Sequence, residues 1–473
     1  LDSGRQGKTH ALAGRLFIAQ GIIAGLRKGR FFMNDILGEI ERECDVLKTF
    51  AYRNSSSWVR IKTYLADTML GAESSSLRKS RISLAATLEL SLVSALNYFR
   101  YVLDVRSKKP RKMFIGAGSG LFSRNGETLD SYYPYKEPGM GSGPYWLSAD
   151  FPERMLKFKR YILKNRIVVF SFLSAPLAAF IGFVIRREKV LSESPTTEKL
   201  CKMLADRKLL ISFEDLERLH KSYIARYWTF RILLAPLKVS EVFLVSAYTY
   251  SEICALMKER GVKIAEIQHG LIGATHNGYN YHIKDNRLPA PHRILVYDEF
   301  WKKELLKAGF FGEEDISVTG RLKYDIISRE RPSPLSLPYV VITGQGILTD
   351  RVIKFMKKAI SDQTKGEKHC VFVYLPHPNE SPDTLKAIRA TFNDSSTVAI
   401  GRTEDYTTEE YIFHSLAHVS IYSSCHFDAV HLIGKTYVLD VMEGNPMAEY
   451  VKSNPEIFVS ITDALQIEEI KNV

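Results

Sequence analysis

Short apolar runs alternate with amphipathic segments over residues 241–319. The runs are typical of buried strands, and the segments between them have the spacing of helices. The predicted strands are Glu241–Ala247, Val262–Ile267, Arg293–Tyr297 and Ile316–Thr319, and the predicted helices are Tyr250–Arg260 and Glu299–Ala308. Elements that alternate in this way are typical of a parallel sheet with helices on both faces.

The same alternation resumes after Arg331–Pro338, a segment with three prolines that is typical of a linker. The predicted strands are Tyr339–Thr343, Cys370–Leu375, Val398–Gly401, His418–Tyr422 and Thr436–Asp440, and the predicted helices are Asp350–Ser361, Pro382–Phe392, Thr407–Leu416 and Phe427–Ile433. We therefore expect an α/β chain with two Rossmann-like domains that face a cleft, where ligands of such proteins usually bind.

The chain before residue 110 has a different pattern, which predicts helices. Ala11–Arg30 mixes apolar with basic residues, and Ser83–Val105 has leucines and a phenylalanine at spacings of three and four, the period of an amphipathic helix. Two interpretations fit, a helical layer packed on the next domain or a basic helix at a membrane surface. The expected parts of the chain are a helical region at 1–110, a Rossmann-like acceptor domain at 111–330 and a Rossmann-like donor domain at 331–473.

Ile167–Ile185 is a stretch of 19 residues without a charge, long enough to cross a bilayer. Pro176 lies at its middle. We interpret the stretch as a buried strand, Ile167–Phe172, followed by a turn and a buried helix from about Pro176, because the residues that follow have the pattern of a globular α/β protein.

The composition, 45% hydrophobic and 25% charged, is that of an ordinary globular protein. The net charge of +12 is unevenly distributed, since residues 1–112 hold 20 Lys and Arg against 10 Asp and Glu, and the rest hold 45 against 43. A basic surplus at one end favours an anionic surface, either phospholipid or nucleic acid, as partner of that end. No nucleic-acid-binding motif accompanies it, so we expect an anionic membrane surface and no nucleic acid.

The five cysteines are scattered without a C-x-x-C pair, which is typical of free thiols in a reducing compartment. Metal-ligating residues gather late in the chain, at His414, His418, Cys425, His426 and His431. A zinc site would need His414 and His418 on one helix face, whereas His418 is predicted to begin a strand. We therefore expect neither a metal nor a cofactor.

Polar residues follow the predicted strands in four places, where the functional residues of parallel sheets gather. Gly344 and Gly346 follow the first strand of the C-terminal domain, and backbone N–H groups there suit a phosphate. His377-Pro378 follows the next strand, where the proline fixes a histidine that can donate to a phosphate oxygen. A plain strand-to-helix turn and an ordinary loop histidine are the alternatives for these two places.

Ser423 and Ser424 precede a predicted helix with Asp428 in its first turn. Their hydroxyls and the free N–H groups of the helix form an anion site, an N-cap, or both. The fourth place is Gln268-His269-Gly270, at a strand end of the N-terminal domain. The histidine there suits acid–base chemistry or anion binding.

The order of these motifs resembles that of the two-domain glycosyltransferases called GT-B. The motifs are Gln268-His269-Gly270, Gly320-Arg321 with Asp325, His377-Pro378, Ser423-Ser424, Asp428-Ala429 and Gly434-Lys435. They are most similar to those of bacterial enzymes of capsule and lipopolysaccharide synthesis, the Kdo and sialic acid transferases with an H-P motif and the related polyol-phosphate transferases. The resemblance covers about Glu241–Ile461.

The resemblance implies that the C-terminal domain holds a nucleotide-sugar donor and the N-terminal domain holds the acceptor. His377, Ser423 and Ser424 would contact the donor phosphates, and Asp428 the ribose. The complete expected donor-binding set is Gly344, Gly346, Arg321, His377, Pro378, Ser423, Ser424 and Asp428.

The expected catalytic group is Asp130, in the loop region after a short predicted strand at Lys112–Gly116, or His269 as the base. Inverting transfer needs a base for the acceptor hydroxyl, whereas retaining transfer can use a carboxylate nucleophile. If His269 binds phosphate instead, the base is unassigned. Positive groups and helix N-termini can stabilise the leaving phosphate without a metal.

The expected function is transfer of a sugar from a nucleotide donor to a surface polysaccharide or a lipid-linked glycan, at the cytoplasmic face of a bacterial inner membrane. The H-P motif favours a CMP-activated acidic sugar, with UDP- and CDP-linked donors close behind. Two alternatives remain open. One is transfer of a polyol phosphate from a CDP donor by the same fold, and the other is a non-catalytic protein that binds membrane or nucleic acid.

Overall fold

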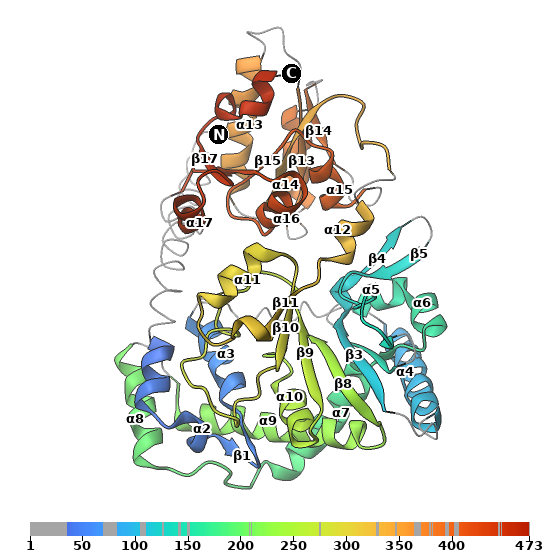
Figure 1. The fold of residues 1–473 in the computed structure, drawn as a ribbon, viewed down its shortest axis with the longest axis vertical. Coiled ribbons are helices and arrows are strands. Elements are labelled where there is room, and N and C mark those ends of the chain that lie inside the picture. Colours follow the sequence, from blue (N-terminus) through green and yellow to red (C-terminus); the bar gives the residue numbers. More distant parts are fainter. Residues whose placement is uncertain are drawn as a thin grey trace, which may run out of the picture. The chain divides into compact units, whose positions relative to one another are not determined.

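The structure is a computed structural model that describes residues 36–472 with short gaps. The gaps are 70–82, 105–109, 125–126, 141–142, 149–151, 208, 210, 274–275, 328–330, 346–347, 364–369, 378–379, 381, 393–396, 402–405, 443–444 and 446. The predicted helix Ala11–Arg30 lies outside the described residues. The chain forms two compact units, one within Gly29–Leu322 and one within Lys323–Val473, and each contains one large parallel sheet (Figure 1).

The unit within Lys323–Val473 is built on six parallel strands in the order β14-β13-β12-β15-β16-β17. The strands are β12 (Tyr339–Thr343), β13 (Val371–Leu375), β14 (Val398–Ile400), β15 (Ala417–Ser420), β16 (Thr436–Leu439) and β17 (Phe458–Ile461). The helices are α12 (Leu322–Ile327), α13 (Thr349–Gln363), α14 (Pro382–Phe392), α15 (Thr408–Phe413), α16 (Cys425–Ile433) and α17 (Ala448–Ser453).

Successive residues of β12 pack on opposite faces of this sheet. Val340 and Ile342 lie in a core with residues of α13 and α14. Tyr339 and Val341 lie in a second core with residues of α15 and α16. Because helices cover both faces, every position of β12 is buried, which is why the strand is a continuous apolar run in the sequence.

The unit within Gly29–Leu322 is built on seven parallel strands in the order β11-β10-β9-β8-β3-β6-β7. The strands are β3 (Arg111–Ala117), β6 (Tyr145–Ser148), β7 (Val168–Val169), β8 (Val239–Val245), β9 (Lys263–Ile267), β10 (Arg293–Val296) and β11 (Ile316–Val318). A hairpin of β4 (Leu121–Arg124) and β5 (Glu127–Asp130) follows β3. Together the two sheets confirm the predicted α/β class with two Rossmann-like domains.

Helices cover both faces of the seven-stranded sheet. On one face, α9 (Phe213–Leu234) and α10 (Ser251–Glu259) pack on β3, β8 and β9. On the other face, α5 (Pro152–Lys157) and α6 (Lys159–Lys164) pack on the same strands, and α11 (Glu299–Leu306) follows β10. Helix α4 (Leu84–Asp104) lies beside the edge strand β7 and contributes Tyr101 to the first core and Leu90 to the second.

The helices before residue 110 are part of this unit and share its cores. Helices α2 (Val46–Thr49) and α3 (Trp58–Met69) pack with α8 (Pro195–Asp206) and with Tyr281 and Leu288. A short hairpin of β1 (Ala51–Tyr52) and β2 (Ser55–Ser56) connects α2 to α3. The described residues of the predicted N-terminal helical region therefore pack on the sheet-containing part of the unit.

The prediction for Ile167–Ile185 is wrong in two respects. The strand is only β7, and the helix that follows, α7 (Ser171–Ile185), begins before Pro176 and contains it. The helix is also not buried, since none of its residues is. An apolar run without periodicity does not distinguish a strand from a helix, so the boundary could not be derived from the pattern. Among the described residues, no helix combines the length and the apolar character that crossing a bilayer would require.

Candidate functional site

The strand order of the C-terminal unit defines where a ligand would bind. Numbered by their order in the chain, its strands lie as 3-2-1-4-5-6, the order of the doubly wound dinucleotide-binding fold. In such a sheet the chain changes direction between the first and fourth strands, here β12 and β15, and a crevice opens at their carboxyl ends. We call this place the C-terminal switch point.

Gly344 and Gln345 follow β12 at this switch point. The Nε2 of Gln345 donates to the Oγ of Ser420 at 3.0 Å, and the Oγ of Ser420 donates to the carbonyl of Thr343 at 2.8 Å. These bonds tie the ends of β12 and β15 together. A Cβ on Gly344 would lie 2.4 Å from the hydroxyl of Tyr374, so only glycine fits there. The predicted Gly346 lies outside the described residues.

His377 and Glu380 lie in the loop after β13, beside the switch point. The backbone N–H of Glu380 donates to the carbonyl of His377 at 2.9 Å, which closes a turn. The side chain of Glu380 is buried and accepts hydrogen bonds from the hydroxyls of Tyr374 and Thr349 through Oε1. Its Oε2 is buried and has no hydrogen-bond partner among the described residues. Pro378 lies outside them.

Ser423 and Ser424 lie after β15, at the start of α16. The Oγ of Ser423 accepts from the backbone N–H of Cys425 at 3.2 Å, whereas Ser424, the N-cap residue, makes no side-chain cap bond and is exposed. Asp428, one turn into the helix, accepts from the hydroxyl of Tyr324 at 2.5 Å. The N-terminus of α16 therefore offers the N–H groups and hydroxyls that an anion needs.

The N-terminal unit has the same strand order, extended by one strand. Counted along the chain, its strands lie as 3-2-1-4-5-6-7, so its switch point falls between β3 and β8. Ser246 follows β8 there and has a φ of 59°, a left-handed conformation that few residues other than glycine adopt. Backbone strain of this kind is often found at functional sites.

His269, the predicted base, lies after β9 and contacts this strained serine. Its Nε2 is 3.0 Å from the Oγ of Ser246 and 3.3 Å from the hydroxyl of Tyr248. Burial lowers the pKa of His269 to about 4, so the imidazole is neutral near pH 7. The Nδ1 of His269 is buried without a hydrogen-bond partner in the described part of the chain.

Asp130 lies at the end of the β4–β5 hairpin and is fully buried. One carboxylate oxygen accepts from the hydroxyl of Tyr145 at 2.5 Å and the other from the backbone N–H of Tyr132 at 2.9 Å. The hydroxyl of Tyr132 donates to the carbonyl of His269 at 3.2 Å. The structure thus brings the two predicted catalytic residues together through Tyr132, with Asp130 holding Tyr132 in place.

Arg321 belongs to the same unit as His269. It follows Gly320, whose φ of 76° requires glycine, and its guanidinium lies 5.1 Å from the centre of the Tyr297 ring. Tyr297 follows β10, and its backbone N–H donates to the side chain of Gln268 at 2.9 Å. Gln268 therefore has a structural role, since it joins the ends of β9 and β10.

Three residues of these sites were missed in the sequence. Ser246 has no motif, and nothing in the sequence marks a serine with positive φ. Glu380 could have been found, because a carboxylate three residues after His377 lies in the same strand-end loop. Glu266, a buried carboxylate of β9, accepts from the hydroxyl of Tyr279 at 2.6 Å, and burial raises its pKa to about 7. An acidic residue inside an apolar strand is a signal that the sequence did contain.

The late histidines and cysteine do not form a metal site in the structure. Nδ1 of His418 and Nδ1 of His426 both lie 2.7 Å from the Oγ1 of Thr436, and the two rings are buried. His418 lies in β15, while His414 ends α15. Over the described ranges, no group of three or more His, Cys, Asp or Glu has a geometry that could hold a metal.

Comparisons with known proteins give structural matches only. No protein-family model matches the chain, and neither does any curated protein sequence. A UDP-N-acetylglucosamine 2-epimerase structure matches with 14% identity and a TM-score of 0.44, over 77% of this chain and 87% of that one. The UDP-GlcNAc 2-epimerase of Methanocaldococcus jannaschii matches with 10% identity and a TM-score of 0.41, over 76% and 91%.

A glycosyltransferase is also among the matches. CalG4, the calicheamicin glycosyltransferase, has 9% identity and a TM-score of 0.40, over 77% of this chain and 93% of that one. With TM-scores below 0.5 and such low identities, these similarities carry no argument about activity. The α/β class of this chain rests on its two sheets and their strand orders.

Proposed function

We propose that this protein is a GT-B-type glycosyltransferase that moves a sugar from a nucleotide donor to a glycan acceptor. The observation that carries the proposal is the C-terminal switch point. There a doubly wound sheet brings together the glycine loop at Gly344, the His377 loop and the serines before α16, all of which were expected to bind a donor. Loops that offer N–H groups and hydroxyls at the carboxyl ends of neighbouring strands suit the phosphates of a nucleotide.

In this proposal the C-terminal unit binds the donor. The N–H groups at the start of α16 and the hydroxyls of Ser423 and Ser424 contact the phosphates, and His377 adds a further donor. Asp428 accepts from a ribose hydroxyl, in competition with the Tyr324 bond it makes in the structure. The Oε2 of Glu380, which has no partner among the described residues, is available to accept a hydrogen bond from a hydroxyl or amino group of the donor.

In the N-terminal unit we propose His269 as the base. The acceptor hydroxyl attacks the anomeric carbon of the sugar, its proton passes to Nε2 of His269, and the bond from that carbon to the donor phosphate breaks. The leaving phosphate retains the electron pair, and its charge is stabilised by the helix N-terminus and its hydroxyls. Asp130 is buried with both oxygens engaged, so its geometry favours a positioning role through Tyr132.

The finer assignment follows the motif resemblance. We propose a CMP-activated acidic sugar as the donor, and a surface polysaccharide or lipid-linked glycan as the acceptor, at the cytoplasmic face of a bacterial inner membrane. The His377-Pro378 motif supports the CMP donor. UDP- and CDP-linked donors, including a CDP-linked polyol, are the alternatives that the first experiment separates.

The experiment is a thermal-shift screen of the whole chain against CMP, CDP, UDP, GDP and ADP. A ligand that binds the native state raises the melting temperature as its concentration exceeds the Kd. We expect a rise with one nucleotide that is lost in His377→Ala and in Ser423→Ala. Ser460→Ala, an exposed serine of β17, is the matched control and should retain the rise. No shift with any nucleotide at millimolar concentration would overturn the proposal.

A further inference from the structure

Helix α4 carries an apolar stripe on the side that faces away from the core. The stripe consists of Leu88, Leu92, Leu96, Phe99 and Leu103, each between 51% and 64% exposed. Spacings of three and four residues place them on one side of the helix. The opposite side packs on the core and contains a buried asparagine, Asn97. Its Nδ2 donates to the carbonyl of Ile167, directly before β7, at 2.9 Å. A continuous apolar stripe of α4 thus faces outwards.

Helix α7 carries a second exposed apolar stripe beside the first. Phe180, Phe183 and Val184 are 66%, 59% and 58% exposed. Helices α4 and α7 pack against each other, and both send side chains into the same core, as Tyr98 from α4 and Leu177 from α7 show. Because the inner sides share one core, the outer sides border one surface. We call the eight exposed residues of the two stripes the α4–α7 face.

Basic residues surround the α4–α7 face. Helices α5 and α6 flank α4, and the chain beyond α7 continues with two arginines. The exposed basic residues of these segments and of the turn after α6 are Lys157, Arg160, Lys164, Arg166, Arg186 and Arg187, of which Arg166 pairs with Asp104 of α4. The guanidinium of Arg186 lies 4.1 Å from the centre of the Phe183 ring, so charge and apolar surface are in direct contact.

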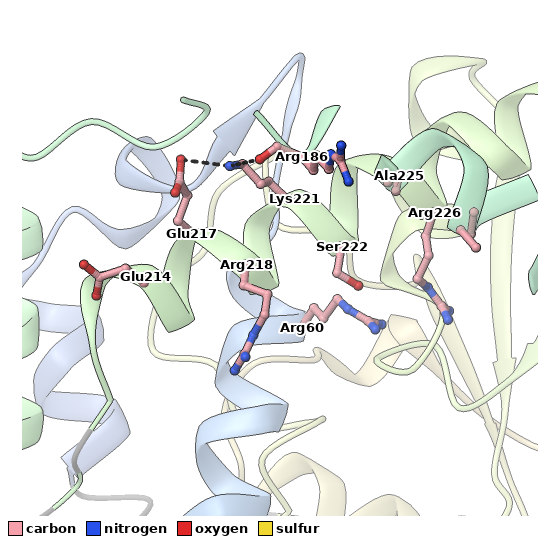
Figure 2. A pocket seen from close by; sticks show the side chains of 12 residues that line it. Arg60, Arg186, Glu214, Glu217, Arg218, Lys221, Ser222, Ala225 and Arg226 are labelled. Atoms are coloured by element: carbon pink, nitrogen blue, oxygen red, sulfur yellow. Dashed lines mark hydrogen bonds and ion pairs between the residues drawn. The ribbon is translucent and has the colours of Figure 1, made fainter. Parts of the chain in front are cut away.

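A basic pocket adjoins α7 on the side toward α9. Its volume is about 630 Å³, and its lining includes Ala178 and Gly182 of α7 and Arg186, which directly follows the helix. Figure 2 shows Arg60 of α3 and Arg226 of α9 beside one another in its wall. Both arginines bond the buried Glu252, whereas the described residues include no carboxylate partner for Arg186. The pocket keeps further positive charge next to the exposed side of α7.

We propose that the α4–α7 face docks on a bilayer of anionic phospholipid, with the aromatic and leucine side chains inserted between acyl chains and the basic residues on the headgroups. Apolar side chains in stripes with arginine and lysine at their borders are typical of interfacial helices. The charge argues against a second copy of the chain as the occupant, because the exposed basic residues at the borders outnumber the exposed carboxylates Glu89, Asp104 and Glu188, and two such faces would bring like charges together. The inference does not depend on the proposed enzymatic function.

The experiment measures binding of the whole chain to two kinds of vesicle, phosphatidylcholine alone and a mixture with phosphatidylglycerol. We expect binding to the anionic vesicles that weakens with salt. The double substitution Leu92→Asp with Leu96→Asp should lower the partition coefficient by about tenfold or more, because it replaces inserted apolar groups by charges. Leu337→Asp changes a leucine with similar exposure outside the face and should leave binding unchanged.

Insertion is measured separately with Leu96→Trp. We expect its fluorescence to shift to shorter wavelength with anionic vesicles and to be quenched by brominated acyl chains. Failure of the unsubstituted chain to bind either vesicle would overturn the proposal, as would undiminished binding of the double variant with an unchanged melting temperature. A dimer that the double variant converts to monomers, without quenching of Trp fluorescence by lipid, would show that a second copy covers the face instead.

Discussion

The hydroxyl of Ser246 lies 3.0 Å from Nε2 of His269, and Ser246 holds this position with a left-handed φ of 59°. For a residue with a Cβ, the left-handed conformation costs about 1–2 kcal/mol. The turn after β8 is therefore strained, and in this strained conformation it places a hydroxyl against the histidine. That placement is at the switch point of the N-terminal sheet, where ligands of such folds bind.

The strain and the hydroxyl of Ser246 can be separated by two substitutions. Ser246→Ala removes the hydroxyl and retains the strain, whereas Ser246→Gly removes both. We expect the glycine variant to be more stable than the alanine variant by about 1 kcal/mol, because glycine adopts positive φ without penalty. Urea unfolding of both variants measures this difference. Equal stabilities would show that the turn relaxes when the hydroxyl is lost.

The same pair of variants tests the catalytic role of the hydroxyl. If Ser246 orients the base, both variants should lose the same share of turnover with the donor that the nucleotide screen identifies, although their stabilities differ. A glycine variant with full turnover would remove Ser246 from the mechanism.

His269→Gln, which retains a polar side chain but no base, should lower kcat by about a hundredfold or more and leave nucleotide binding intact.

The close approach at Gly344 predicts that Gly344→Ala damages the donor site. Its Cβ would lie 2.4 Å from the hydroxyl of Tyr374 and 2.9 Å from Oε1 of Glu380, and Tyr374 is buried and cannot move freely. We expect a loss of about 1–3 kcal/mol in stability, typical of overpacking, and loss of the nucleotide-induced rise in melting temperature. Gly270→Ala is the control, because its Cβ would meet nothing within 4 Å.

The buried carboxylate of Glu266 predicts a pH dependence of stability. Burial raises its pKa from the usual value near 4.5 to about 7, so between these values the folded state holds a proton that the unfolded state has released. The free energy of unfolding should therefore fall as the pH rises from 4.5 to 7, by up to about 3 kcal/mol, and then level off. Glu266→Gln retains an oxygen acceptor for Tyr279 without a charge.

Unfolding of the wild type and of Glu266→Gln at pH 5 and pH 8 measures the effect. The variant should gain stability relative to the wild type as the pH rises between these points. A difference that is the same at both values would mean that Glu266 titrates alike in the folded and unfolded states, and that its site admits water.

The C-terminal sheet could be predicted because its strands are buried on both faces. The apolar run Tyr339–Thr343 ends at a polar loop and coincides with β12, whereas the predicted strand His418–Tyr422 begins one residue later than β15 and ends two residues beyond it. The alternation of strands and helices predicted a parallel sheet, whereas the strand order that defines the switch point came from the structure. In the N-terminal unit β7 has only two residues, too short for a pattern, and α7 is apolar on all sides, so neither could be delimited.

The sites were harder to predict than the sheets, for reasons of distance and conformation. Asp130 accepts a hydrogen bond from Tyr145, and no local pattern shows that a residue on another strand will bury the carboxylate and bind one of its oxygens. The positive φ of Ser246 arises from the tertiary turn. The stripe on α4 had the correct period, but periodicity does not tell whether an apolar side faces the core or the outside.

Buried histidines predict that the free energy of unfolding falls in acid, and His220 offers the most direct test. Its ring is buried against Phe50, its Nδ1 lies 2.8 Å from the Oγ of Ser57, and burial lowers its pKa from 6.5 to about 4. Between these pH values the unfolded state binds a proton that the folded state does not. Stability should therefore fall as the pH falls from 6.5 to 4, and His220 alone should contribute about 3 kcal/mol of that fall.

Urea unfolding of the wild type and of His220→Gln from pH 7.5 to pH 4 isolates this contribution. At pH 7.5, where the ring is neutral in both states, the difference between the two proteins reports only packing and the bond to Ser57. We expect the two stability curves to converge as the pH falls, because the variant lacks the titrating ring. The variant should still lose stability in acid, since burial also lowers the pKa of His269 to about 4 and that of His426 to about 3. Curves that remain parallel down to pH 4 would show that the His220 ring has its ordinary pKa in the folded state.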